Sequence, residues 1–177
     1  PLGDLTEEEA LDYFRESIEA GVSEGADCIL IETMSTLEEA LVCVQAAKAY
    51  GGGLPVLCTL TYNEGGRILT GADVEATVAA LEAAGVDALG CNCGVGPEQF
   101  VNLLPRFTAA AHLPLIMQPN AGLPVYQDGK TVYLVGPEAF AEQMRLLYDG
   151  GVWGIGGCCG TTPEHIAQIA KFAKADA

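Results

Sequence analysis

Basic side chains are scarce in this chain. Its 177 residues include 8 Lys and Arg against 24 Asp and Glu, so the formal net charge is −16 at pH 7. A nucleic-acid partner requires a basic surface that neutralises phosphates, and an anionic membrane surface attracts proteins through the same kind of charge. The composition therefore excludes nucleic-acid binding and disfavours membrane attachment, and the acidity itself favours solubility.

Long apolar runs are also missing. No stretch of 18 or more apolar residues occurs, so no transmembrane helix is expected. No basic and apolar leader with a small-residue cleavage site is visible, so we expect no secretory signal and a cytoplasmic location. Neither a Ser-His-Asp order nor a P-loop pattern is present, which disfavours those two kinds of catalytic site.

Cysteine, by contrast, is abundant and odd in number. An odd set without a secretory signal indicates a reducing compartment, where clustered cysteines are more often metal ligands or catalytic groups than disulfides. The seven cysteines are Cys28, Cys43, Cys58, Cys91, Cys93, Cys158 and Cys159.

Short apolar segments alternate with helical patterns along the whole chain. Helix starts are indicated by a capping box at 6–9, by Asp73 and by Pro97, and 120–136 is expected to be a long connection with a turn at 128–129. The strands recur with a period of roughly 30 residues, which is typical of parallel α/β folds. We predict buried strands at 26–32, 55–61, 87–92, 114–119 and 152–156.

Two α/β architectures fit this pattern, a doubly wound open sheet and a (β/α)8 TIM barrel. A complete barrel takes ~250 residues, and here a helix precedes the first strand. We therefore predict that the chain carries the C-terminal five βα units of a barrel. No linker divides the sequence, so residues 1–177 are expected to form a single, partial barrel domain.

Reactive side chains gather where the predicted strands end. Glu32 ends the first strand, 92–93 (Asn-Cys) ends the third, Asn120 follows the fourth and 158–159 (Cys-Cys) follows the fifth. Barrels place their active sites at the carboxyl ends of their strands. We therefore expect these side chains to meet around one mouth.

The adjacent cysteines Cys158 and Cys159 can share one metal ion only if the backbone leaves the extended form, because neighbours on a strand point to opposite faces. The flanking glycines allow such a turn. A vicinal disulfide and two packed thiols are the alternatives. Cys91 and Cys93 share strand parity, so periodicity does not choose between them as a third ligand.

Other candidates have plain structural interpretations. Glu32 could form a salt bridge or cap a helix, and Asn120 could serve as a turn residue. His112 is expected at an exposed helix end and His165 in a structural hydrogen bond. The remaining cysteines in predicted strand or helix interiors, Cys28, Cys43 and Cys58, are expected in the core.

Four segments resemble the signature motifs of the homocysteine S-methyltransferase family, in the right order along the chain. They are 29–34 (ILIETM), 90–93 (GCNC), 119–124 (PNAGLP) and 156–166 (GGCCGTTPEHI). The similarity extends over essentially all residues, and within the family it is strongest to the homocysteine-binding module of cobalamin-dependent methionine synthases.

This resemblance implies a TIM barrel with a catalytic Zn²⁺ held by Cys93, Cys158 and Cys159. It also implies that Glu32 binds the amino group of homocysteine and that Asn120 lies near the metal. The implied reaction transfers a methyl group to homocysteine and gives methionine. Its implied donor is methylcobalamin, bound on another module or protein.

The chain departs from the family in having no counterpart of the first barrel strands and their Asp-Gly-rich segment. Three other functions stay open at this point. They are a methyltransferase that uses betaine or S-methylmethionine, a non-catalytic zinc-binding fragment completed by a partner chain, and a redox protein that uses the vicinal cysteines.

Overall fold

The computed structural model describes residues 3–173, and it confirms the α/β class and the barrel-type arrangement. A parallel sheet has the strand order β1-β2-β3-β4-β7, and a separate hairpin pairs β5 with β6. The strands are β1 (Ile29–Met34), β2 (Val56–Leu60), β3 (Ala88–Asn92), β4 (Leu115–Gln118), β5 (Pro124–Gln127), β6 (Lys130–Tyr133) and β7 (Gly154–Ile155). The helices are α1 (Glu7–Ser23), α2 (Leu37–Tyr50), α3 (Val74–Ala84), α4 (Pro97–Ala110), α5 (Pro137–Asp149) and α6 (Pro163–Ala173).

The predicted helix signals act as caps in the structure. Thr6 and Glu9 form a reciprocal capping box at the start of α1. That helix runs through Gly21, and Gly25 adopts the left-handed conformation just beyond the helix. A single glycine costs a helix about 1 kcal/mol, which the packing of α1 against α2 offsets.

Asp73 provides a measurable cap for α3. Its side chain accepts a hydrogen bond from the backbone N–H of Ala76 at 3.1 Å and also lies 3.8 Å from Arg67. We expect Asp73→Ala to lower the unfolding free energy by about 1 kcal/mol in urea titrations. Asp73→Asn keeps the cap and loses the exposed ion pair, so it should stay close to wild type. An equal loss in both variants would contradict the assignment to the cap.

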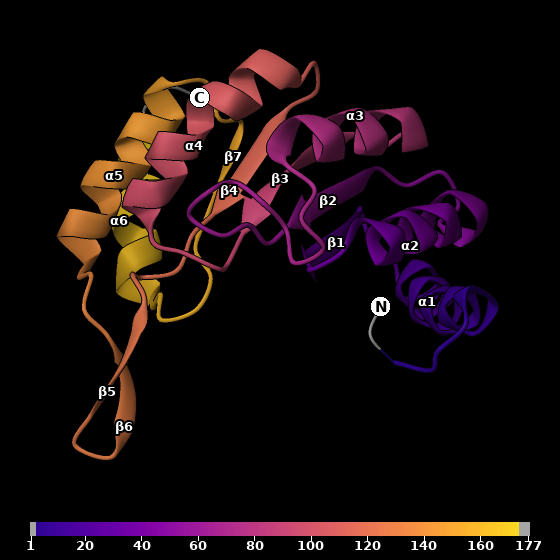
Figure 1. The fold of residues 1–177 in the computed structure, drawn as a ribbon, viewed down its shortest axis with the longest axis horizontal. Coiled ribbons are helices and arrows are strands. Elements are labelled where there is room, and N and C mark those ends of the chain that lie inside the picture. Colours follow the sequence, from indigo (N-terminus) through magenta and orange to yellow (C-terminus); the bar gives the residue numbers. More distant parts are fainter. Residues whose placement is uncertain (1–2, 174–177) are drawn as a thin grey trace.

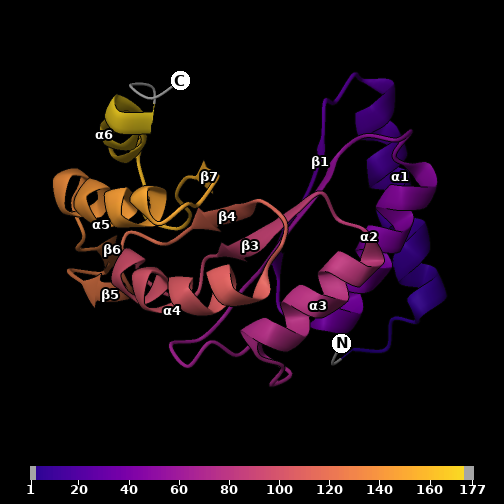
Figure 2. The same ribbon diagram turned by 90° about the horizontal axis from the view of Figure 1, so that it is seen from above.

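The main core lies between the sheet and the six helices. Consecutive helices pack on one another and follow the outer side of the sheet (Figure 2). Phe100, Phe107, Phe140 and Met117 are among the largest side chains in this core, each 1% exposed or less. Burial of this kind contributes about 25 cal/mol for each Å² of apolar surface removed from water.

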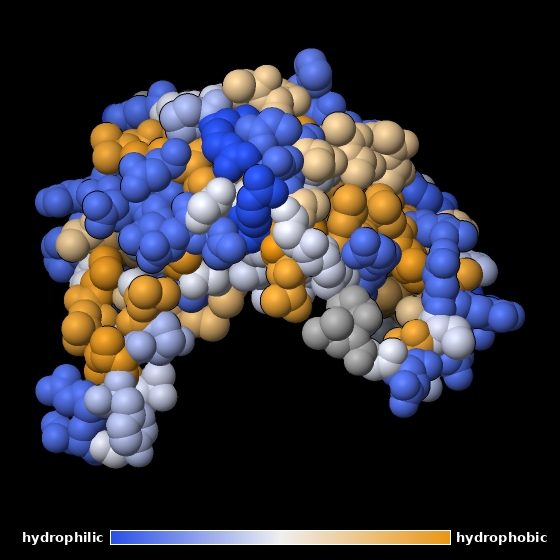
Figure 3. Space-filling view, viewed as in Figure 1, coloured by the Kyte–Doolittle hydropathy of each residue, from blue (hydrophilic) through white to orange (hydrophobic). Residues whose placement is uncertain are grey.

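The opposite face of the sheet is concave. Ile116 and Ala88 are buried there but lie outside the main hydrophobic cluster. The space-filling view shows the molecule hollowed between the β5–β6 hairpin and α1 (Figure 1, Figure 3). This is the shape expected of a barrel segment whose inner face looks into the barrel.

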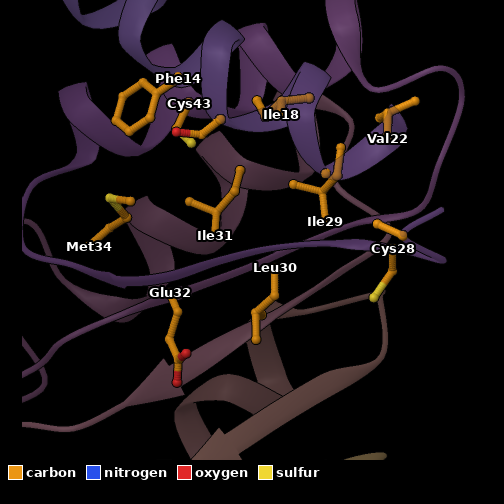
Figure 4. A pocket seen from close by; sticks show the side chains of 13 residues that line it. Phe14, Ile18, Val22, Cys28, Ile29, Leu30, Ile31, Glu32, Met34 and Cys43 are labelled. Carbon is orange, nitrogen blue, oxygen red and sulfur yellow. The ribbon is translucent and has the colours of Figure 1, made fainter. Parts of the chain in front are cut away.

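β1 corrects two of our predictions. It runs from Ile29 to Met34 rather than from 26 to 32, so Glu32 lies within the strand and does not end it. It is also an edge strand in which only Ile31 is buried, because its outer edge and concave face have no packed neighbour among residues 3–173. Ile29 and Ile31 point toward α1 beside a cavity of about 430 Å³, whereas Leu30 and Glu32 point to the other side (Figure 4). Cys28 also lies on this open side and is exposed, so its predicted core position is wrong.

The predicted long connection at 120–136 contains an antiparallel hairpin of two strands, β5 and β6, which its sequence pattern did not indicate. Asp128 and Gly129 form its tip with positive φ angles of 50° and 77°, as two-residue hairpin turns require. The strands β5 and β6 are largely exposed, so their sequences lack the pattern of buried apolar residues by which a strand is recognised. Within 3–173, the helices are too short or too polar to cross a bilayer.

Candidate metal centre

The thiols of Cys93, Cys158 and Cys159 converge at the carboxyl-end mouth of the sheet. Their Sγ atoms all lie within 4.8 Å of one another. The Cys93–Cys159 distance is 3.8 Å and the Cys158–Cys159 distance is 4.0 Å. Tetrahedral zinc with Zn–S bonds of ~2.3 Å separates its sulfur ligands by ~3.8 Å. The donor set therefore fits Zn²⁺, with room for a fourth ligand.

A sharp turn after β3 aims Cys93 at this point. Cys93 has φ 60° and Gly94 has φ 70°, a left-handed conformation that costs energy for a residue other than glycine. The N–H of Cys93 donates to the carbonyl of Gln118 at 3.1 Å, and its own carbonyl accepts from Val95 at 2.7 Å. A Cβ at Gly94 would lie 2.6 Å from the Tyr62 carbonyl oxygen. Strand pairing and this close approach together hold the strained turn.

The two adjacent cysteines occupy a second turn, as their predicted convergence on one metal requires. The N–H of Cys158 donates to Pro119 at 2.9 Å, and the carbonyl of Cys158 accepts from the N–H of Thr161 at 3.1 Å and from its hydroxyl at 2.7 Å. Gly160 completes the turn at φ 80°. All seven cysteines are free thiols, and the 4.0 Å separation of the pair exceeds the ~2.05 Å of a disulfide.

The thiol cluster favours a cation. Burial raises the pKa of Cys158 to about 11, and the neighbouring Cys93 adds to the increase, because adjacent thiolates repel each other. A divalent cation at the centre of the cluster would offset this repulsion and hold the sulfurs as thiolates.

Cys91 points away from the cluster. It is fully buried in the main core, and burial raises its pKa well above the usual value. The two cysteines of equal strand parity therefore differ because the chain turns at Cys93 and not at Cys91. Periodicity assumes a continuing strand, so it contained no signal for this choice.

Asn120 and Glu32 both reach the mouth. Asn120 is 4% exposed, and its side-chain oxygen accepts from the N–H of Cys159 at 3.0 Å. Glu32 is exposed, and its Oε1 lies 3.5 Å from Nδ2 of Asn92. Among residues 3–173 Glu32 forms no ion pair, so the predicted alternative of a salt bridge has no support.

The two histidines lie outside the cluster. His112 is 87% exposed on its side chain and lies 3.1 Å from Glu82, as expected for a helix end. His165 is 5% exposed, and its Nε2 lies 2.9 Å from the carbonyl oxygen of Val135. Its Nδ1 accepts from the N–H of Thr162 at 3.1 Å. These bonds fit the structural role expected of His165.

Fold and site together describe a parallel α/β barrel segment with a cluster of three cysteine thiols at its mouth, whose spacing fits a metal ion. The family model for homocysteine S-methyltransferase matches residues 1–173. The chain belongs to the homocysteine S-methyltransferase family.

Curated relatives include two methionine synthases. The one from Mycobacterium leprae (strain TN) is 35% identical over 164 residues, which cover 90% of this chain and 14% of the relative. The one from Mycobacterium tuberculosis (strain ATCC 25618 / H37Rv) is 34% identical over a match with the same coverage. The chain thus spans about one-seventh of the length of these relatives.

The chain covers a larger part, though not all, of the solved structures it resembles. The apo form of the homocysteine methyltransferase MmuM from Escherichia coli matches with a TM-score of 0.77 and 26% identity, over 94% of this chain and 57% of that one. Its metallated form matches with a TM-score of 0.77 and 25% identity, over 99% and 54%. Dihydrodipicolinate synthase from Acinetobacter baumannii, at 17% identity and a TM-score of 0.62, shares the fold.

Proposed function

We propose that this chain carries the metal centre and part of the homocysteine site of an enzyme that methylates the thiol of homocysteine to give methionine. The observation that carries the proposal is the convergence of three Sγ atoms within 4.8 Å. Family membership and the similarity to methionine synthases support the same reaction. The proposal includes the prediction that residues 1–177 form a single, partial barrel domain.

Cys93, Cys158 and Cys159 would hold zinc, and the fourth position would take the substrate sulfur. A free thiol has a pKa of ~8.5 and is mostly protonated at neutral pH. Zinc bound there would lower the pKa of the homocysteine thiol and hold it as the nucleophilic thiolate. Three cysteine thiolates exceed the charge of the metal by one, so the ligands keep the substrate sulfur electron-rich. The exposed position of Cys159 leaves that sulfur accessible to a methyl donor.

Glu32 would bind the ammonium group of homocysteine. Its carboxylate points to the concave side of β1 (Figure 4), the side on which Asn92 lies. Asn120 would hold the turn that carries Cys159, through its 3.0 Å hydrogen bond to the N–H of that residue. The site would thus recognise its substrate at two ends, the thiol and the amino group.

We propose methylcobalamin, bound on another module or protein, as the methyl donor, because the curated relatives are methionine synthases. Betaine and S-methylmethionine are the competing donors. Incubation of the zinc-loaded chain with homocysteine and each donor in turn separates the three. Methionine formed with either of the other donors and not with methylcobalamin would refute this choice.

The substrate role of Glu32 is tested by Glu32→Gln. A charge-assisted hydrogen bond contributes about 1.5–3 kcal/mol, so we expect the dissociation constant of homocysteine to rise about tenfold to a hundredfold. Calorimetric titration of the zinc-loaded protein measures this, and elemental analysis should show unchanged zinc. Glu98→Gln, an exposed change on α4, is the matched control. Equal affinity in Glu32→Gln and wild type would refute the role.

A further inference from the structure

The buried carboxamide of Asn92 connects the two ends of the proposed substrate site. Asn92 ends β3 and is fully buried. Its Oδ1 accepts from the N–H of Thr33 at 2.9 Å and from the hydroxyl of Thr59 at 2.8 Å. Its Nδ2 lies 2.6 Å from Oγ1 of Thr33, 3.5 Å from Oε1 of Glu32 and 3.8 Å from Sγ of Cys158.

These contacts use both ends of the amide. An asparagine side chain offers two acceptor positions and two N–H donors. Both acceptor positions are taken by the neighbouring strands β1 and β2. The two N–H donors of Nδ2 face three acceptors, which are the Thr33 hydroxyl, the Glu32 carboxylate and the Cys158 thiol. Asn92 therefore lies between a side chain proposed to bind the substrate and one proposed to bind the metal.

Asn92 also holds a strained residue next to Glu32. Thr33 has φ 63°, which is costly for a β-branched side chain. The pairing of β1 with β2 shifts register at this point, between Ile31 and Met34. Asn92 stabilises this kink by accepting a hydrogen bond from the N–H of Thr33 and donating one to its hydroxyl. Without them Thr33 can return to an extended conformation, which would change the direction of the Glu32 side chain.

We infer that Asn92 is a positioning residue, which orients Glu32 toward the substrate amino group and donates to the Cys158 sulfur. The inference rests on the proposed function, because it assumes that homocysteine binds between these groups. Residues that orient metal ligands and substrate carboxylates typically change affinity or activity by about 10- to 100-fold when replaced.

The test compares homocysteine with 4-mercaptobutyrate, which is homocysteine without its amino group. The dissociation constant of 4-mercaptobutyrate divided by that of homocysteine, both measured on the zinc-loaded chain, reports recognition of the amino group alone. We expect Asn92→Leu, similar in size but without hydrogen bonds, to lower this ratio about tenfold. In chelator competition its zinc should also be released more readily than that of wild type.

Thr77→Val provides the structural control. Thr77 is fully buried on α3, and its hydroxyl lies 2.6 Å from that of Tyr62 and makes no hydrogen bond to Glu32, Asn92 or the three cysteines. Its loss should lower the melting temperature and leave the ratio unchanged. If Asn92→Leu does not fold, Asn92→Ser replaces it in the test. Its hydroxyl is too short to contact both Glu32 and Cys158, so we expect the same decrease in the ratio of dissociation constants.

The outcomes separate the inference from the function. A wild-type ratio in a folded Asn92 variant, with a lower melting temperature alone, would overturn the positioning role and leave the function standing. If zinc-loaded wild-type protein binds neither ligand, the proposed function fails and the inference with it. A collapsed ratio in the Asn92 variant, with a normal ratio in Thr77→Val, supports the inference.

Discussion

Replacement of Cys159 by serine is expected to reduce the zinc content from about one atom per chain to less than a tenth of that. Cys159 lies within 4.0 Å of both other sulfurs, so it makes both of the short contacts in the cluster. Serine is a poor substitute because its hydroxyl stays protonated at neutral pH, whereas zinc binds thiolates. Two thiolates would remain, too few for the three protein ligands of a catalytic zinc site.

The measurement is elemental analysis of protein purified under reducing conditions without chelator. Cys91→Ser is the matched control, since Cys91 lies on β3, two residues before Cys93, and points into the core. That variant should lose stability, because a hydroxyl replaces a buried thiol, and should keep its zinc. Full zinc in Cys159→Ser, or loss of zinc in folded Cys91→Ser, would show that the ligands are assigned wrongly.

The order of strands and the location of the mouth could be predicted from the sequence, because both follow from local patterns. Apolar segments at a period of roughly 30 residues specify parallel βα units. Polar residues at strand ends then fall at one edge of the sheet. Asp73 caps the start of α3 as predicted, since capping depends on residues three or four apart.

The rest depended on contacts between distant segments. The Cys91–Cys93 ambiguity was decided by the hydrogen bond from Cys93 to Gln118, 25 positions further on. Asn92 was expected at the mouth as a strand-end residue but was given no role there, because its partners Thr33 and Cys158 are 59 and 66 positions away. The exposure of β1 depends on which elements pack beside it, and the apolar sequence of the strand itself does not reveal this.

Gly90→Ala is expected to be the most damaging change of a single methyl group in the sheet. Gly90 pairs with Ile116 between β3 and β4. A Cβ at Gly90 would overlap the carbonyl oxygen of Ile116 and lie 2.8 Å and 2.9 Å from its backbone carbon and nitrogen. A backbone cannot rotate aside as a flexible side chain can, so the two strands must separate. We expect a loss of about 3 kcal/mol in unfolding free energy.

The same displacement should reach the metal centre, because Cys93 lies three residues beyond Gly90 and its turn is fixed by pairing with β4. Urea unfolding and zinc competition should therefore both change. Gly21→Ala is the matched control. A Cβ there would lie 4.0 Å from its nearest neighbour, within a helix, so stability should rise by up to about 1 kcal/mol and zinc affinity should stay constant. If Gly90→Ala lowers stability and leaves zinc affinity at the wild-type value, the position of Cys93 does not depend on the β3–β4 pairing, and the turn alone holds it.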